Sequence, residues 1–296
     1  QIILTNNLPL DLYIQQTCLC RASSLIAEKH WTLKTHTHRK TNYKTHMETI
    51  DGELRRILDS TYNDISDKIR PTLNINQNYS TNIPRRSEFK VSNNPISIKV
   101  FTDGSKDDIE NTGYGLHILD ESANMGYSEM TSLKKTNSVF QAEACGIEAS
   151  AKILSQWNTK NRDIIFYSDS QATIKSLQKT KITSETIRNC NNALINLANN
   201  QNRVTVSWIP GHKGHEGNEL ADTLAKIGAT SSHKIQNIKT PHKTITSHIK
   251  KHYSERHILK WNFSDPHRNC AYPINIPLKK CNLNLAALKN SFLRLS

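Results

Sequence analysis

The sequence contains no apolar stretch near the length of about 18 residues that a membrane-spanning helix needs. Its first residues have neither a basic start nor a long apolar run, so we expect no secretory signal. We therefore expect an intracellular protein, nuclear or cytoplasmic, with no membrane partner. An initiating methionine is also lacking, since Gln1 comes first, and this leads us to expect a piece of a longer protein.

Cysteine is present but lacks the spacing that typifies metal sites and disulfide frameworks. None of the six cysteines forms a C-x-x-C pair, and six in 296 residues is ordinary for a reduced, intracellular protein. His267, Cys270 and Cys281 fit no zinc spacing that we recognise. We expect free thiols.

Apolar and aromatic residues are scarce, at 36% and 6% of the chain. A fully packed globule is usually richer in apolar residues, at roughly 45–50% with glycine included. We therefore expect one compact domain with poorly ordered or helical flanks. Changes in composition divide the chain into residues 1–95, 96–230 and 231–296.

Basic residues are concentrated at the carboxyl end. The chain has a formal net charge of +13, and residues 231–296 hold 12 Lys and Arg against 2 Asp and Glu. A basic segment beside a nearly neutral middle favours a polyanionic partner, such as the phosphate backbone of nucleic acid. The alternative is a solvated basic tail without a partner. No obligate protein partner is evident.

Residues 1–95 lack the patterning of a continuous folded domain. Amphipathic runs predict helices over residues 8–27 and about 48–69. Residues 71–95 are rich in Asn, Ser and Pro, which is typical of a polar linker.

Residues 96–230 alternate between strand and helix patterns. Strand-like runs begin at residues 96, 113, 124, 163 and 204. Helical patterns follow over residues 139–154, 171–177, 184–198 and 219–226, and Gly228 is the expected C-cap of the last helix. The order βββ-α-β-α-α-β-α indicates an α/β fold with a mixed sheet.

Four carboxylates occupy special places in this order. Asp103 and Asp169 end two strands, whereas Glu143 and Asp222 lie on helices beside them. Sites in α/β sheets gather at the carboxyl ends of strands, so these side chains could converge. Four like charges in a small volume require cations, and oxygen ligands suit two Mg²⁺ or Mn²⁺ ions about 4 Å apart, a template for phosphodiester hydrolysis.

The motifs around these acids resemble the type 1 ribonuclease H domain. TDGS, QAEACGIEA, YSDSQ and WIPGHKGHEGNELADTLAK occur in that family's order and at its separations. The resemblance covers residues 96–230 and implies a five-stranded mixed sheet flanked by helices. It also implies metal-dependent endonucleolytic hydrolysis of the RNA strand of RNA–DNA hybrids, leaving 5′-phosphate and 3′-hydroxyl ends.

The resemblance assigns roles residue by residue. Asp103, Glu143, Asp169 and Asp222 match the metal-binding carboxylates. His212 matches a loop histidine that assists proton transfer or product release, and His215 is a weaker match. Contacts to the nucleic acid are implied for Gly104, Ser105, Ser170, Gln171 and Asn218. Thr136 and Asn137 match a pocket for a phosphate of the DNA strand.

Two other functions remain compatible with the sequence. One is a catalytically inactive or repurposed nucleic-acid-binding module with a ribonuclease H-like fold. The other is a transposase or integrase of the same superfamily, although those enzymes usually place their last acid in a different helical context from GNELAD.

The flanks are similar to those of one group of reverse transcriptases. NLPLDLYIQQTCLCRASSLIAEKHW resembles the segment that joins reverse transcriptase to ribonuclease H in insect non-LTR retrotransposons of the jockey-like group. VFQAEA, ILKWNFS and HRNCAYPI are also similar to those elements. This resemblance implies a carboxyl-terminal fragment of a retrotransposon polyprotein.

Overall fold

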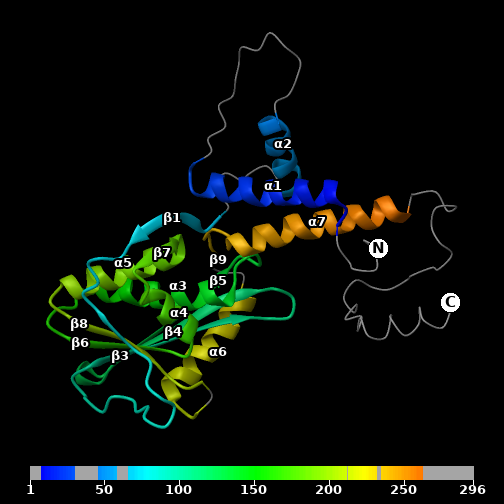
Figure 1. The fold of residues 1–296 in the computed structure, drawn as a ribbon. Coiled ribbons are helices and arrows are strands. Elements are labelled where there is room, and N and C mark those ends of the chain that lie inside the picture. Colours follow the sequence, from blue (N-terminus) through cyan, green and yellow to red (C-terminus); the bar gives the residue numbers. More distant parts are fainter. Residues whose placement is uncertain (1–7, 31–45, 59–65, 212, 232–234, 263–296) are drawn as a thin grey trace, which may run out of the picture.

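A mixed sheet with helices on both faces forms the centre of the molecule (Figure 1). The computed structural model describes residues 8–30, 46–58, 66–211, 213–231 and 235–262. The five predicted strands are β3 (Ile98–Lys106), β4 (Thr112–Asp120), β5 (Met125–Leu133), β6 (Asp163–Ser168) and β8 (Arg203–Trp208). The predicted α/β class and mixed sheet are confirmed.

Four helices cover this sheet as the sequence predicts. They are α3 (Val139–Gln156), α4 (Gln171–Leu177), α5 (Glu185–Asn199) and α6 (Glu216–Thr230). Consecutive residues of a strand face opposite sides of the sheet. In β3, Val100 is buried in the cluster that includes α3, whereas Phe101 is buried with Ala221 of α6. Helices α3 and α6 therefore pack on opposite faces.

The sheet is wider than the five predicted strands, because two short strands add to its edges. Strand β2 (Ser80–Asn82) pairs in parallel with β8, and β9 (Ile235–Gln236) pairs in parallel with β5. The strand order is β2-β8-β6-β3-β4-β5-β9. Covering an edge strand removes exposed main-chain donors and acceptors, so both flanks complete the sheet.

The expected linker at residues 71–95 is partly a strand segment, which corrects the sequence interpretation. Strand β1 (Lys68–Leu73) forms a separate two-stranded antiparallel sheet with β7 (Lys181–Ser184), and β2 follows it. The polar residues of β2 gave no strand pattern because its pairing depends on main-chain hydrogen bonds with β8. A short 3-10 helix, η2 (Glu121–Ala123), joins β4 to β5.

Gly228 lies inside α6 and is not the predicted C-cap. A Cβ atom at this position would lie 3.0 Å from the carbonyl oxygen of Tyr114 and 3.1 Å from the amide nitrogen of Thr131. The glycine thus allows α6 to approach the backbone of β4 and β5 closely. The helix begins at Glu216 and continues to Thr230.

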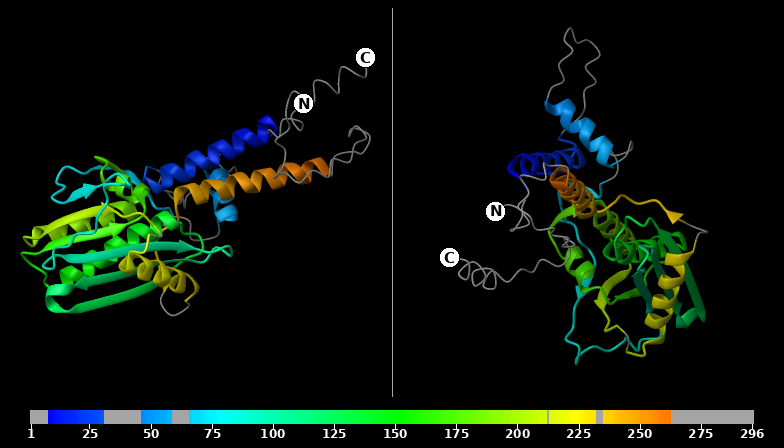
Figure 2. Two further views of the ribbon diagram at one scale, coloured as in Figure 1. Left: turned by 90° about the horizontal axis from the view of Figure 1, so that it is seen from below. Right: turned by 90° about the vertical axis from the view of Figure 1, so that its right-hand side faces the viewer.

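The two flanks of the chain meet in a helical unit beside the sheet. Its helices are α1 (Leu10–Ala27), α2 (His46–Leu58) and α7 (His242–Asn262). Helices α1 and α7 lie side by side (Figure 2), and Arg256 donates a hydrogen bond of 3.2 Å to Gln15. The shared core consists of Leu12, Leu19, Ala22, Leu54, Ile245, Ile249 and Tyr253. The expected helix over residues 48–69 ends at Leu58 in the described chain, and Lys68 already belongs to β1.

Polar contacts join these flanks to the amino ends of α3 and α5. The carboxylate of Asp67 is buried and accepts hydrogen bonds from the hydroxyl of Ser184 and from the amide and hydroxyl of Thr186. Its own amide donates to the carbonyl of Thr240 at 2.8 Å. The carbonyl of Lys239 accepts a 2.9 Å hydrogen bond from the side chain of Gln141. Both flanks are therefore fixed near the helix that carries Glu143.

None of the helices in the described ranges is long and apolar enough to cross a membrane. The free thiols there are Cys18, Cys20, Cys145 and Cys190. His267, Cys270 and Cys281, for which no zinc site was expected, lie outside the described residues.

Candidate active site

Three acids from three different elements meet at one end of the central strands. Asp103 lies on β3, Glu143 on α3, and Asp169 directly after β6, and ligand oxygens of the three carboxylates lie within 4.8 Å of one another. Strands β3 and β6 are parallel, with Thr102 opposite Ser168. Asp103 follows Thr102, and Asp169 follows Ser168. The two acids therefore lie at the same level of the sheet.

The first turn of α3 fixes the position of Glu143 relative to β3. Ser138 and Gln141 form a capping box, in which each side chain accepts a hydrogen bond from the main chain of the other. Gly104 lets β3 approach this helix, because a Cβ there would lie 2.7 Å from the amide nitrogen of Glu143. The hydroxyl of Ser168 donates a 3.1 Å hydrogen bond to Oε2 of Glu143. Sequence reasoning did not single out Ser168, although it lies inside the YSDSQ motif.

Burial and mutual repulsion raise the pKa values of these carboxyls. Burial, followed by the charges of Asp169 and Asp222, raises the pKa of Asp103 to about 7. Burial also raises the pKa of Glu143 well above its usual range, and the charges of Asp103 and Asp169 add to this. In the absence of a cation the cluster therefore retains protons near neutral pH.

The donor set fits a hard divalent cation. All three grouped ligands are carboxylate oxygens, which suit Mg²⁺ and Mn²⁺ better than softer metals. A bound cation would remove the repulsion that raises the pKa values of Asp103 and Glu143. These residues could therefore hold a divalent metal ion.

Asp222 approaches the cluster from α6, on the other side of β3. Its charge contributes to the raised pKa of Asp103, so the two carboxylates interact. The three-acid group does not include Asp222, whose Oδ2 pairs with the Nζ atom of Lys226 at 2.7 Å. This ion pair lies within one helix, four residues apart.

Of the two loop histidines, the structure describes only His215. His212 lies outside the described residues, but Gly211 before it lies against the cluster. A Cβ at Gly211 would lie 2.7 Å from Oδ2 of Asp169. His215 comes just before α6, and its ring contacts the ring of Phe89 edge to face at 5.3 Å. The structure thus gives His215 a packing contact outside the acidic cluster.

The expected contacts next to the acids lie close to them in the chain. Gly104 and Ser105 follow Asp103 on β3 and are partly exposed. Ser170 caps α4 by accepting a hydrogen bond from the amide of Thr173, and Gln171 is the first residue of that helix. Asn218 is buried in α6, and its Oδ1 atom has no hydrogen-bond partner in the described part of the chain.

Asn137 has a structural role that its motif did not reveal. Its side chain is fully buried, and its amide nitrogen donates to the side chain of Gln141 and to the carbonyl of Lys239, at 3.1 and 3.2 Å. The hydroxyl of Thr136 bonds to that of Thr240 at 3.0 Å. Residues of the carboxyl-terminal flank thus contact both residues for which the resemblance implies binding of a phosphate of the DNA strand.

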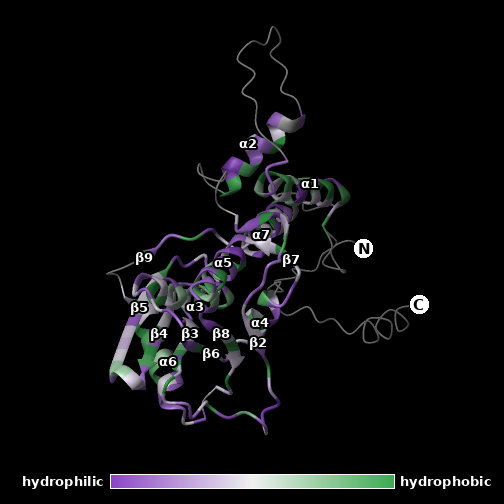
Figure 3. Cartoon of the chain, turned by 90° about the vertical axis from the view of Figure 1, so that its left-hand side faces the viewer, coloured by the Kyte–Doolittle hydropathy of each residue, from purple (hydrophilic) through white to green (hydrophobic). Residues whose placement is uncertain are grey.

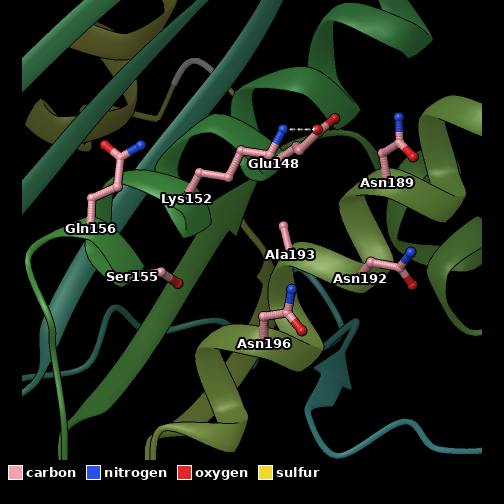
Figure 4. Close-up of a pocket in the computed structure, with 8 residues that line it drawn as sticks. All are labelled: Glu148, Lys152, Ser155, Gln156, Asn189, Asn192, Ala193 and Asn196. Carbon is pink, nitrogen blue, oxygen red and sulfur yellow. Dashed lines mark hydrogen bonds and ion pairs between the residues drawn. The ribbon is translucent and has the colours of Figure 1, made fainter.

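A polar groove of about 500 Å³ lies between α3 and α5 (Figure 4). Three asparagines of α5 line it, and Lys152 and Glu148 form an ion pair on its α3 side. It contains none of the acids described above. The groove is therefore separate from the acidic cluster.

Comparison with known proteins agrees with this geometry. Residues 95–230 match the sequence model of the RNase H family. This segment has an RNase H-like fold. All four acids and both loop histidines lie within it.

Individual relatives match this chain over different lengths. A ribonuclease H of Jannaschia sp. (strain CCS1) is 58% identical over 31 residues, which are 10% of this chain and 20% of that protein. The chain thus spans about a fifth of the length of this curated relative. RNase H1 of Halobacterium salinarum NRC-1 is 18% identical, covering 45% of this chain and 96% of that chain, with a TM-score of 0.37.

A second solved structure shows a similar coverage. The N-terminal RNase H domain of a Mycobacterium tuberculosis protein, solved as a fusion with maltose-binding protein, is 15% identical. The match covers 46% of this chain and 99% of that chain, with a TM-score of 0.38.

We predict that the metal-free protein becomes less stable as the pH rises. Because the folded pKa of Asp103 is about 7, against 3.8 for the free side chain, the folded state binds more protons in this interval. The free energy of unfolding should therefore fall through this window, by about 1–3 kcal/mol in total. Asp103→Asn should flatten the decline. Urea unfolding in EDTA at pH 5.5 and pH 8 measures it.

The exposed Asp108→Asn provides the control, since it removes a carboxylate away from the cluster. Equal pH dependence in the wild type and in Asp103→Asn would contradict the assigned repulsion.

Proposed function

We propose that residues 95–230 form a type 1 ribonuclease H, an endonuclease that hydrolyses the RNA strand of RNA–DNA hybrids with divalent metal ions. The proposal is carried by the three carboxylates within 4.8 Å of one another, in a segment that matches the RNase H family model. Asp169 directly follows β6, and Gly211 of the loop after β8 lies against its carboxylate, so the cluster borders a loop that an extended substrate can approach.

Asp103, Glu143 and Asp169, together with Asp222, are the proposed ligands of two Mg²⁺ ions, with Mn²⁺ as a substitute. Bound divalent ions supply a water of lowered pKa and stabilise charge on the leaving 3′ oxygen. The chain itself contributes orientation. Ser168 holds Glu143 by a hydrogen bond, and Gly211 lies against Asp169. In this scheme His212 moves a proton during hydrolysis or product release.

Recognition of RNA requires contact with its 2′-hydroxyl groups across a wide minor groove. We assign this contact to small polar groups beside the acids. Ser105 follows Asp103 by two residues and is partly exposed. The proposed contacts are Gly104, Ser105, Ser170, Gln171 and Asn218.

The flanking resemblance supports an origin in a retrotransposon polyprotein and an intracellular setting, nuclear or cytoplasmic. The segment that resembles the reverse-transcriptase connection includes α1, which packs against α7. Much of the similar carboxyl-terminal sequence lies outside the described residues.

Cleavage of an end-labelled RNA strand tests the proposed activity. The RNA should be cut when it is paired with DNA and Mg²⁺ or Mn²⁺ is present. It should remain intact in EDTA, as single strands or in an RNA duplex. Binding of the hybrid without cleavage would instead support the inactive nucleic-acid-binding module, and would overturn this proposal.

We predict that Asp103→Asn and Asp169→Asn each abolish cleavage while keeping the fold and most of the affinity for the hybrid. The amide keeps the shape of the side chain but removes the charge that metal ligation needs. The control is Asp163→Asn at the opposite end of β6. Near wild-type turnover of either site variant in Mg²⁺ would refute the proposed metal site.

We predict that His212→Ala slows turnover about 10–100-fold, as is typical of an assisting proton-transfer group. His215→Ala should change kcat much less, because that ring packs against Phe89. Its effect should appear in thermal stability. Steady-state kinetics measure kcat for both variants. Equal losses of kcat would contradict the assignment of His212.

We predict that α7 contributes sequence-independent attraction to phosphates. Lys243, Lys250 and Lys251 are exposed on this helix. Their joint replacement by alanine should weaken hybrid binding and flatten its dependence on salt, with kcat unchanged. Deleting residues 231–296 is a poorer test, since it also removes the α7 residues that pack against α1. Superimposable plots of Kd against salt would leave α7 without this role.

A further inference from the structure

Residues 83–92, here called the strap, run along the edge of the sheet where the acids lie. Strand β2 is parallel to β8, with Asn82 opposite Ser207, and β8 is parallel to β6. The chain therefore leaves β2 at the edge where Asp169 follows β6. The strap precedes the segment that matches the RNase H family model, and its path is visible in Figure 1 below the strands.

An aromatic contact fixes the strap to this face of the sheet. The ring of Phe89 lies edge to face on Tyr167 at 6.1 Å and on His215 at 5.3 Å. The amide of Ser92 donates a 2.9 Å hydrogen bond to the hydroxyl of Tyr167. Phe89 also packs against the small core cluster that contains Phe101. The strap is thus attached at several points.

Tyr167 and Phe101, the sheet residues on which the strap packs, each lie two residues before an acid of the cluster. Phe101 precedes Asp103 by two residues within β3, so these two share a side of the sheet, and Tyr167 precedes Asp169 by two residues at the end of β6. Two residues of a strand span about 7 Å. The major groove of B-form DNA alone is about 12 Å wide, so a duplex over the acids spans more than this separation. A duplex that extends from the acids toward Tyr167 therefore meets the strap.

The strap carries basic side chains within four residues of Phe89 in the chain. Arg85, Arg86 and Lys90 are exposed, and the side chain of Arg85 has a relative exposure of 85%. Its nearest ion-pair contact is with Glu88, at 3.8 Å and also at the surface. The loops at the lower end of the molecule in Figure 3 are mostly hydrophilic. The guanidinium groups therefore remain accessible to phosphate.

We propose that Arg85, Arg86 and Lys90 of the strap bind the phosphate backbone of the nucleic-acid duplex on one side of the acidic cluster. This inference rests on the proposed function. It adds a binding element from outside the RNase H-like segment. The strap supplies positive charge close to, but separate from, carboxylates that would otherwise repel the backbone.

The test replaces all three basic residues of the strap by alanine and measures binding of a labelled RNA–DNA hybrid in EDTA. The Kd should rise about 10–100-fold at low salt, and the slope of log Kd against log salt should fall by about 2–3, near one for each lost phosphate contact. In Mg²⁺ the KM should rise to a similar extent, with kcat changed less than about twofold, because no metal ligand is altered.

The matched control is Lys152→Ala/Lys160→Ala/Arg203→Ala, which makes the same change in net charge. These residues are exposed, and Lys160 and Arg203 lie near the amino ends of β6 and β8, away from the acids. The conservative variant Arg85→Lys/Arg86→Lys should keep the wild-type salt slope.

The strap proposal is overturned if the strap variant and the control bind the hybrid equally, or if the strap variant lowers kcat with KM unchanged. A wild type that binds the hybrid but never cleaves it refutes the proposed function alone. The measurement in EDTA still decides whether the strap binds the duplex.

Discussion

Repulsion among buried carboxylates is the constraint around which this structure is organised. Asp103, Glu143 and Asp169 place ligand oxygens within 4.8 Å of one another, and burial, followed by this mutual repulsion, raises the pKa values of Asp103 and Glu143. Such a cluster opposes folding unless protons or cations neutralise it. The surrounding structure must therefore be stable enough to hold the acids together.

Both flanks of the chain contribute to that stability at the amino ends of α3 and α5. The carbonyl of Lys239 and the carboxylate of Asp67 bind the amino ends of α3 and α5 through Gln141 and Thr186. Gln141 also belongs to the capping box of α3, two residues before Glu143. The orientation of a proposed metal ligand thus depends on segments from both sides of the RNase H-like segment. The flanks are structural parts of the same molecule.

The sequence predicted the features that local residues determine. The central strands and their order along the chain follow from periodicity, and the motifs TDGS and YSDSQ locate two of the acids. Asp103 was expected to end its strand, but β3 continues to Lys106. The role of Asn137 was not predictable in this way, because its partner, the carbonyl of Lys239, is 102 residues away. The packing of α7 could have been predicted from the spacing of its apolar residues, but the expectation for this segment rested only on its basic charge. Ile245, Ile249 and Tyr253 recur every four residues and form one buried helix face.

In the proposed function, the separation of charges assigns nucleic-acid affinity to segments outside the acidic cluster. Carboxylates that attract metal ions repel phosphates, and a basic residue in contact with them would compete for the same oxygens. Lys226 illustrates this competition, since its Nζ atom already pairs with Asp222 at 2.7 Å. Positive charge that holds a polyanion must therefore lie beyond the ligand oxygens but within reach of a neighbouring phosphate. The proposed strap contacts are consistent with both conditions, because Phe89 packs on Tyr167, two residues before Asp169, and the arginines of the strap are exposed.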